Sequence, residues 1–129
     1  MAEESKRILV VDDDELLLSF YSRVLDTKGY VAVGASNGDE AIDILDSEGT
    51  SIDLAIIDLL MPIRTGFEVI DHMRGEADLK HIPIIAITGF ATSDDQVIKV
   101  KDNCDAIVLK SDFEIENFLD TVSNLLEKN

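Results

Sequence analysis

Hydrophobic residues in this chain alternate between short uninterrupted runs and longer stretches in which they recur every three or four positions. The clearest run extends from Leu54 to Pro62 and is interrupted only by Asp58. A short apolar run without polar alternation is typical of a strand covered on both faces, as in the centre of a parallel sheet. Four further runs predict strands: Ile8 to Val11, Val31 to Val33, Ile82 to Ile87 and Ala106 to Leu109.

Each predicted strand is followed by a stretch with helical spacing of apolar residues. The apolar stripes are Leu17, Phe20, Tyr21, Val24 and Leu25; Ala41, Ile42 and Leu45; Phe67, Ile70 and Met73; Val97, Ile98 and Val100; and Ile115, Phe118, Leu119, Val122, Leu125 and Leu126. Five strands alternating with five helices predict an α/β fold, a doubly wound parallel sheet with helices on both faces.

Several residues indicate where helices begin and end. Asn37 can cap the second helix, and Gly29 closes the first with a residue that accepts unusual backbone angles. Ser111 and Glu114 have the spacing of a capping box, so we expect the last helix to begin there. Gly66 is predicted to need a positive φ before the third helix.

Length and charge restrict the class of protein. A chain of 129 residues suits one domain, and its net charge of −16 disfavours binding to nucleic acid or anionic lipid. The sequence lacks a run long enough to insert into a membrane and an apolar signal-peptide core, so we expect a soluble cytoplasmic protein. We interpret Cys104 as a packing residue and His72 and His81 as surface residues.

Chemically active side chains stand at the ends of four predicted strands. Asp12 and Asp13 follow the first, Asp58 ends the third, Thr88 ends the fourth and Lys110 follows the fifth. Taken singly, each could be a helix cap, a turn residue or a solvated charge. Taken together, they should meet in the crevice at the carboxyl edge of the sheet. Three converging carboxylates repel one another unless protonated or bound to a cation, which predicts an all-oxygen site for Mg²⁺ or Mn²⁺.

A carboxylate beside a divalent ion, a hydroxyl and an ammonium can accept a phosphoryl group. That transfer depends mostly on positioning and on neutralising spread negative charge. We expect Asp58 to be the nucleophile, Lys110 to pair with a phosphoryl oxygen and Thr88 to donate a hydrogen bond.

The sequence resembles response-regulator receiver domains of two-component signalling over nearly its whole length. The marks that carry the resemblance are Asp12-Asp13, the D-x-x-M-P run from Asp58 to Pro62, Gly66, Thr88 and Lys110. It implies a flavodoxin-like sheet with strand order 2-1-3-4-5. Residues 7–127 would form the receiver domain, and residues 1–6 a flexible N-terminus.

The resemblance also implies a function. Asp58 would take its phosphoryl group from a histidine kinase or a histidine phosphotransfer protein, and the change would switch contacts with a downstream protein target. Such a domain catalyses only its own phosphorylation and dephosphorylation, so it is not an enzyme in the usual sense. Asp13, Asp58 and the Leu60 backbone carbonyl would bind the ion, with Asp12 acting mainly through water. Leu60 and Phe90 would flank the path of the hydrolytic water, and we expect slow dephosphorylation.

Three positions depart from the family pattern. Ser111 follows Lys110 where most receivers have a cis proline, and we expect the Lys110-Ser111 bond to be trans. Ile107 occupies the position of a switch aromatic, and Asn103 replaces a frequent glycine. The first two departures question the usual output mechanism rather than phosphorylation itself.

Three other classes fit less well. A Mg²⁺-dependent phosphohydrolase normally has an acid two residues after its nucleophile, where this chain has Leu60. A degenerate receiver that only binds a partner has no need of the full set of site residues. An FMN-binding flavodoxin would place the cofactor phosphate against Asp12 to Glu15, which would repel it.

Overall fold

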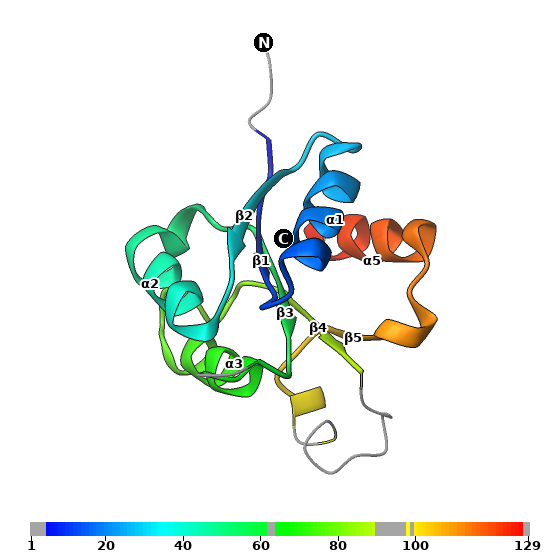
Figure 1. Ribbon diagram of the computed structural model, residues 1–129. Helices are drawn as coiled ribbons and strands as arrows, with labels where there is room; N and C mark the ends of the chain where they lie inside the picture. The colour runs from blue at the N-terminus through cyan, green and yellow to red at the C-terminus, as the bar shows by residue number, and fades with distance from the viewer. Residues whose placement is uncertain (1–4, 62–63, 90–97, 99, 128–129) are drawn as a thin grey trace.

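The computed structural model describes residues 5–61, 64–89, 98 and 100–127. The chain forms a five-stranded sheet in the order β2-β1-β3-β4-β5, with every neighbouring pair parallel (Figure 1). The strands are β1 (Arg7–Val11), β2 (Val31–Ala35), β3 (Leu54–Asp58), β4 (Ile84–Thr88) and β5 (Ala106–Leu109). The predicted fold class and strand order are confirmed.

Helices cover both faces of the sheet. Helices α1 (Glu15–Asp26) and α5 (Ile115–Glu127) lie on one face, and α2 (Gly38–Glu48) and α3 (Gly66–Gly75) lie on the other (Figure 1). Two short 3₁₀ helices, η1 (Gly49–Ser51) and η2 (Lys110–Asp112), precede β3 and follow β5. Five helices were expected, and the described residues contain four complete ones. The expected fourth helix falls mostly outside the described residues, although Ile98, Val100 and Lys101 are helical.

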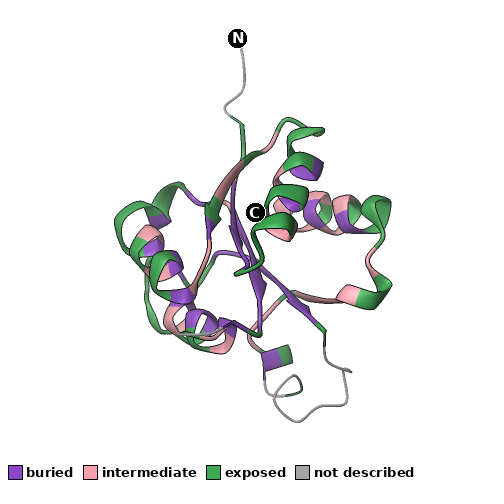
Figure 2. Ribbon diagram, viewed as in Figure 1, coloured by how far each residue is buried: buried purple, intermediate pink, exposed green. Residues whose placement is uncertain are grey.

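The central strands are the most buried part of the molecule. Every residue of β3 and β4 is buried, which explains their uninterrupted apolar sequences (Figure 2). One apolar cluster lies between the sheet and helices α2 and α3, and a second lies between the sheet and helices α1 and α5. Helices therefore pack against both faces of the sheet and fix the strands whose carboxyl ends carry the predicted site residues.

Two predicted helix boundaries are confirmed. The side chain of Asn37 accepts a hydrogen bond of 2.8 Å from the Glu40 amide at the start of α2. After α1 the backbone turns at Gly29 with a φ of 79°. A third cap lies beside the acidic residues, because the Asp14 side chain accepts from the amides of Leu16 and Leu17 at the start of α1.

A glycine is needed at position 66, but the reason predicted for it was wrong. Gly66 does not have a positive φ. An added Cβ would instead overlap the Asp58 carbonyl oxygen and lie 2.7 Å from the Leu59 Cα. Glycine is needed here because two stretches of backbone approach closely.

The predicted capping box at Ser111 was also wrong. Helix α5 begins at Ile115, and its first turn is closed by a 2.9 Å hydrogen bond from the Phe118 amide to the Glu114 carbonyl. Ser111 lies in η2, which has no side-chain cap. The extended backbone of Phe113, with φ −62° and ψ 127°, separates η2 from α5 and prevents one continuous helix.

Two polar side chains make contacts that the sequence did not predict. The Arg74 guanidinium donates to the carbonyls of Asn103, Lys80 and Ile82 at 2.6 to 2.9 Å, which ties α3 to the segments before β4 and β5. The His72 Nε2 lies 2.7 Å from Asp46 Oδ1 and links α3 to α2. Cys104 packs against the α2–α3 side of the core, as expected.

Within the described part of the chain, no helix has both the length and the apolar character that crossing a membrane requires.

Candidate functional site

Three carboxylates converge where β1 and β3 end. One oxygen from each of Asp12, Asp13 and Asp58 lies within 4.8 Å of the other two. Because β1 and β3 are neighbours in the sheet, their carboxyl ends place these acids side by side. Asp12 and Asp58 are 1% and 2% exposed, whereas Asp13 is exposed. The predicted acidic cluster is confirmed.

Backbone hydrogen bonds fix Asp12 in this cluster. Its amide donates to the Ala35 carbonyl at 3.1 Å, which extends the pairing of β1 with β2 by one residue. Its Oδ1 accepts a 2.8 Å bond from the Asp14 amide. Its Oδ2 is buried and has no hydrogen-bond donor among the described residues. One oxygen of Asp12 is therefore held by a backbone amide, whereas the other lacks a hydrogen bond from any described residue.

Lys110 brings a positive charge to the same cluster. Its Nζ lies 3.3 Å from Asp58 Oδ2 and 3.9 Å from Asp12 Oδ2. The other oxygen of Asp58 accepts from the Leu60 amide at 3.2 Å. The Lys110-Ser111 bond is trans, and the ammonium points towards the acids, so both predictions for Lys110 are confirmed.

Burial disfavours the ionised form of Asp12 and Asp58 and so raises the pKa of both side chains. It is the largest cause of a rise in the pKa of Asp12 from 3.8 to about 6, and the negative charge of Asp58 adds to that rise. The Asp14 amide and the Lys110 ammonium oppose it. The pKa of Asp58 is raised for the same main reason and is opposed by the Leu60 amide and by Lys110. Among the described residues, Lys110 is the one cation paired with these acids, which leaves the cluster short of positive charge.

The donor set suits a hard divalent cation. Three carboxylates supply only oxygen ligands, which Mg²⁺ and Mn²⁺ prefer. The Oδ2 of Asp12 accepts no hydrogen bond within the described part of the chain, and the pKa values of Asp12 and Asp58 are raised. Both observations indicate a site that gains stability from added positive charge. The residues present therefore fit a Mg²⁺ site.

The remaining predicted site residues lie at the same edge or outside the described residues. Thr88 is fully buried at the end of β4, the strand beside β3. Leu60 is 47% exposed next to Asp58, and Phe90 lies outside the described residues. Ile107, at the position expected for a switch aromatic, is half-buried on β5 and packs against the α2–α3 side of the core.

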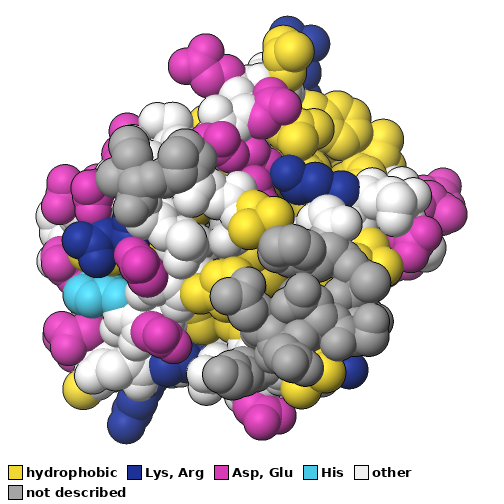
Figure 3. Space-filling view, turned by 60° about the horizontal axis from the view of Figure 1, so that its bottom comes forward, with side chains coloured by type: hydrophobic (Ala, Val, Ile, Leu, Met, Phe, Trp, Pro, Cys, Tyr) yellow, Lys and Arg dark blue, Asp and Glu magenta, His cyan; other side chains and the backbone are white. Residues whose placement is uncertain are grey.

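Figure 3 looks onto the carboxyl end of the sheet, which is the lower end in Figure 1. Acidic side chains lie beside a basic group there, with hydrophobic side chains next to them.

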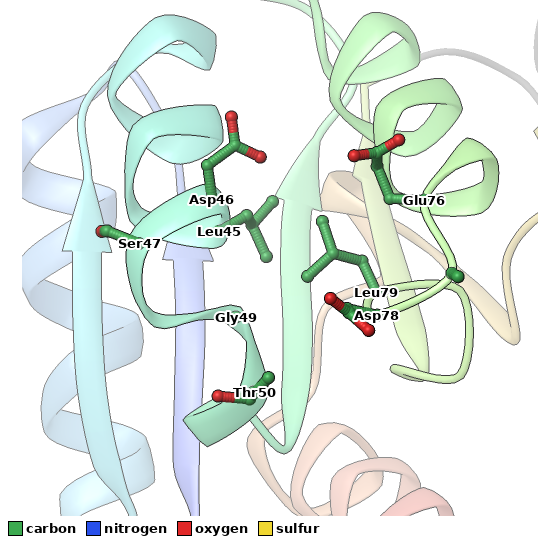
Figure 4. Close-up of a pocket in the computed structure, with 9 residues that line it drawn as sticks. Leu45, Asp46, Ser47, Gly49, Thr50, Glu76, Asp78 and Leu79 are labelled. Carbon is green, nitrogen blue, oxygen red and sulfur yellow. The ribbon is translucent and has the colours of Figure 1, made fainter.

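A separate pocket of about 390 Å³ lies between the end of α2, η1 and the segment after α3, and is lined by residues such as Leu45, Thr50 and Leu79 (Figure 4). This pocket is at the opposite end of β3 from Asp58, so it is not part of the acidic site.

Comparison with known proteins establishes the family. A sequence model described as the response regulator receiver domain matches residues 8–123. The chain therefore belongs to the response regulator receiver domain family. It is a phosphoacceptor module of two-component signalling rather than an enzyme with a separate substrate, and such a module has a histidine kinase as partner.

Individual relatives agree with this assignment. The polar-differentiation response regulator DivK of Brucella anthropi is 29% identical over 121 residues, which cover 94% of this chain and 96% of DivK. The chemotaxis protein CheY4 of Vibrio cholerae is 27% identical, with a TM-score of 0.84 and coverage of 95% and 99%. The response regulator TrrA of Thermotoga maritima, in complex with Mg²⁺-BeF, is 31% identical, with a TM-score of 0.80 and coverage of 93% and 98%.

Proposed function

We propose that Asp58 is the residue that accepts the phosphoryl group, in a reaction that depends on Mg²⁺. One observation supports this choice above the others: Asp58 alone among the clustered acids is both 2% exposed and within hydrogen-bond distance of Lys110. Asp12 is equally buried, but its Oδ2 lies 3.9 Å from the ammonium. The carboxylate nearest to the ammonium is best placed to form the new O–P bond as the bond to the donor's leaving group breaks, because the same ammonium can neutralise charge on the phosphoryl oxygens.

The other site residues have distinct proposed roles. Asp13, Asp58 and the Leu60 backbone carbonyl hold Mg²⁺, and Asp12 acts on it mainly through water. The ion, when bound, neutralises charge on the phosphoryl oxygens. Lys110 pairs with a further oxygen as a point charge, and Thr88 donates a hydrogen bond to the transferred group.

The proposed partners follow from the family and the charge. The donor is a phosphohistidine on a sensor histidine kinase or on a histidine phosphotransfer protein, and the phosphorylated domain switches contacts with a downstream protein target. The net charge of −16 supports a protein target rather than nucleic acid or a membrane surface. We place the reaction in the cytoplasm, where histidine kinases use ATP.

Two proposals concern regulation. In receivers, the positions of Leu60 and Phe90 flank the approach to the phosphoryl group. Neither side chain can hydrogen-bond a water, so phosphorylated Asp58 should hydrolyse slowly. Ile107 cannot act as an aromatic switch, so the output depends on a different movement from the one that pairs Thr with an aromatic. Its packing against the α2–α3 side of the core supports a fixed inward position.

Intact-protein mass spectrometry tests the proposed acceptor. Wild type, Asp58→Asn and Asp71→Asn are incubated with a small phosphodonor and Mg²⁺, and in parallel with a chelator. Asp71 is an exposed acid on α3 and provides the matched control. We expect one phosphoryl group on wild type and Asp71→Asn with Mg²⁺, and none on Asp58→Asn. Equal labelling of all three proteins would disprove the assignment.

A further inference from the structure

The segment that leads from Lys110 to α5 has a single internal anchor. Residues 111–117 are all exposed except Phe113, which is half-buried. The segment has neither a proline nor a side-chain cap to fix it, since η2 lacks a cap hydrogen bond and Ser111 follows Lys110. Whatever holds this segment in place must therefore act largely through Phe113.

The Phe113 ring is held by three other aromatic rings. Its centroid lies 5.6 Å from that of Phe20, 5.5 Å from that of Tyr21 and 5.0 Å from that of Phe118. These distances and the tilted or edge-on angles are those of favourable aromatic pairs. Tyr21 and Phe118 are 3% and 2% exposed, so the ring packs against a fixed part of the core.

This aromatic cluster connects the helix that follows the acids to the segment that follows Lys110. Phe20 and Tyr21 belong to α1, which begins directly after the acidic stretch Asp12 to Asp14. On the other side, the Phe113 amide donates to the Lys110 carbonyl at 3.4 Å and closes the turn of η2. The ring of Phe113 thus ties the backbone of Lys110 to the helix that follows the acids.

We propose that Phe113 is a positioning residue that holds the Lys110 ammonium against Asp58 and Asp12. In this chain it does so in the absence of a proline after the lysine. The proposal rests on the proposed role of Lys110 in phosphorylating Asp58. It makes a prediction that a purely structural role does not make. Releasing Lys110 removes a cation that competes with Mg²⁺, so Mg²⁺ should bind more tightly while phosphorylation becomes slower.

The test measures two quantities on the same variants at one fixed pH of about 8. Isothermal titration calorimetry gives the Mg²⁺ affinity, and mass spectrometry gives the phosphorylation rate at saturating Mg²⁺ with a small phosphodonor. For Phe113→Ala we expect about two- to tenfold tighter Mg²⁺ binding and a rate lower by a similar factor, from the usual strength of aromatic pairs. Phe113→Leu should also tighten Mg²⁺ binding and slow phosphorylation, but to a smaller extent. Phe113→Tyr should keep the Mg²⁺ affinity and the rate close to their wild-type values.

Two further variants separate positioning from stability. Val122→Ala removes buried volume from the same side of the core on α5, outside the aromatic cluster, and should lower the melting temperature without tightening Mg²⁺ binding. Lys110→Met should tighten Mg²⁺ binding by itself, and adding Phe113→Ala to it should cause no further change in Mg²⁺ affinity.

These measurements distinguish failure of the positioning role of Phe113 from failure of Asp58 as the phosphoryl acceptor. Unchanged or weaker Mg²⁺ binding in Phe113→Ala and Phe113→Leu overturns the positioning role, as does a further gain in affinity when Phe113→Ala is added to Lys110→Met. If Mg²⁺ binds more tightly as expected but wild type is not phosphorylated at Asp58, the positioning of Lys110 stands and the proposed function fails.

Discussion

Gly66 lies directly against the main-chain carbonyl of Asp58, so close that an added Cβ would overlap the carbonyl oxygen. The Gly66 amide also donates to the Leu59 carbonyl at 3.2 Å. The start of α3 is therefore docked onto the backbone that carries Asp58 and Leu60. This contact links the packing of a helix to the geometry of the acidic site.

Replacing Gly66 by alanine should damage both stability and the site. The methyl group meets backbone rather than a flexible side chain, so α3 or the segment after β3 must shift. We expect Gly66→Ala to lower the free energy of unfolding by roughly 1 to 3 kcal/mol and to weaken Mg²⁺ binding. Urea unfolding and calorimetric titration measure the two effects.

Gly75→Ala is the matched control on the same helix. An added Cβ at Gly75 has no heavy atom within 4 Å, and its φ is not positive. Alanine there should be neutral or stabilising by roughly 0.4 to 1 kcal/mol. Equal loss of stability in the two variants would contradict the close-approach explanation for Gly66.

Asp12 should lower the stability of the metal-free protein at neutral pH. Its pKa rises from 3.8 to about 6 on folding, so between these values the folded state binds more protons than the unfolded state. The free energy of unfolding contributed by this group therefore falls as pH rises from about 4 to 6, by roughly 1 to 3 kcal/mol in total. Asp12→Asn should be more stable than wild type above about pH 7, and should have no such advantage near pH 4. A variant less stable than wild type at both pH values would refute this.

Mg²⁺ affinity should fall as pH falls through about 6, because protons then compete for Asp12. Titrations of wild type with Mg²⁺ across this pH range measure the effect. The effect should be smaller in Asp12→Asn, in which Asp58 is the remaining buried acid with a raised pKa. An affinity that stays constant across the range would show that Asp12 does not face the ion.

Dephosphorylation should accelerate when Leu60 becomes polar. Leu60 is 47% exposed beside Asp58, and its side chain offers no hydrogen bond to a water. An asparagine at this position could orient a water towards the phosphoryl group, so we expect faster decay in Leu60→Asn. Phosphoryl decay is followed at one fixed Mg²⁺ concentration, with Phe90→Glu as a second variant. If neither variant decays faster than wild type, the lifetime is set elsewhere.

The sequence was sufficient for the features that depend on local patterns. Uninterrupted apolar runs identified the strands, and the position of Asp58 at the end of one predicted that the acids would meet. The helix cap at Asn37 followed from a side chain that bonds a nearby amide. The strand order came from the family resemblance, because periodicity alone does not order parallel strands.

The features that the sequence did not predict depend on contacts between distant residues. Ser111 and Glu114 have the spacing of a capping box, but Phe113 packs against α1 and interrupts the helix there. Gly66 is needed for a contact with Asp58 and not for its own backbone angles. The three carbonyls that Arg74 binds come from residues up to 29 positions away, which no local pattern indicates.

Chemical trapping can locate the phosphoryl group on the chain and so test whether Asp58 accepts it. Wild-type protein is phosphorylated with a small phosphodonor and Mg²⁺, and the aspartyl phosphate is reduced with borohydride, which converts that aspartate to homoserine. Peptide mass spectrometry then reads the modified position. We expect homoserine at position 58, and only when Mg²⁺ is present. Homoserine at position 12 or 13 instead, or a phosphoryl group on His72 or His81, would contradict it.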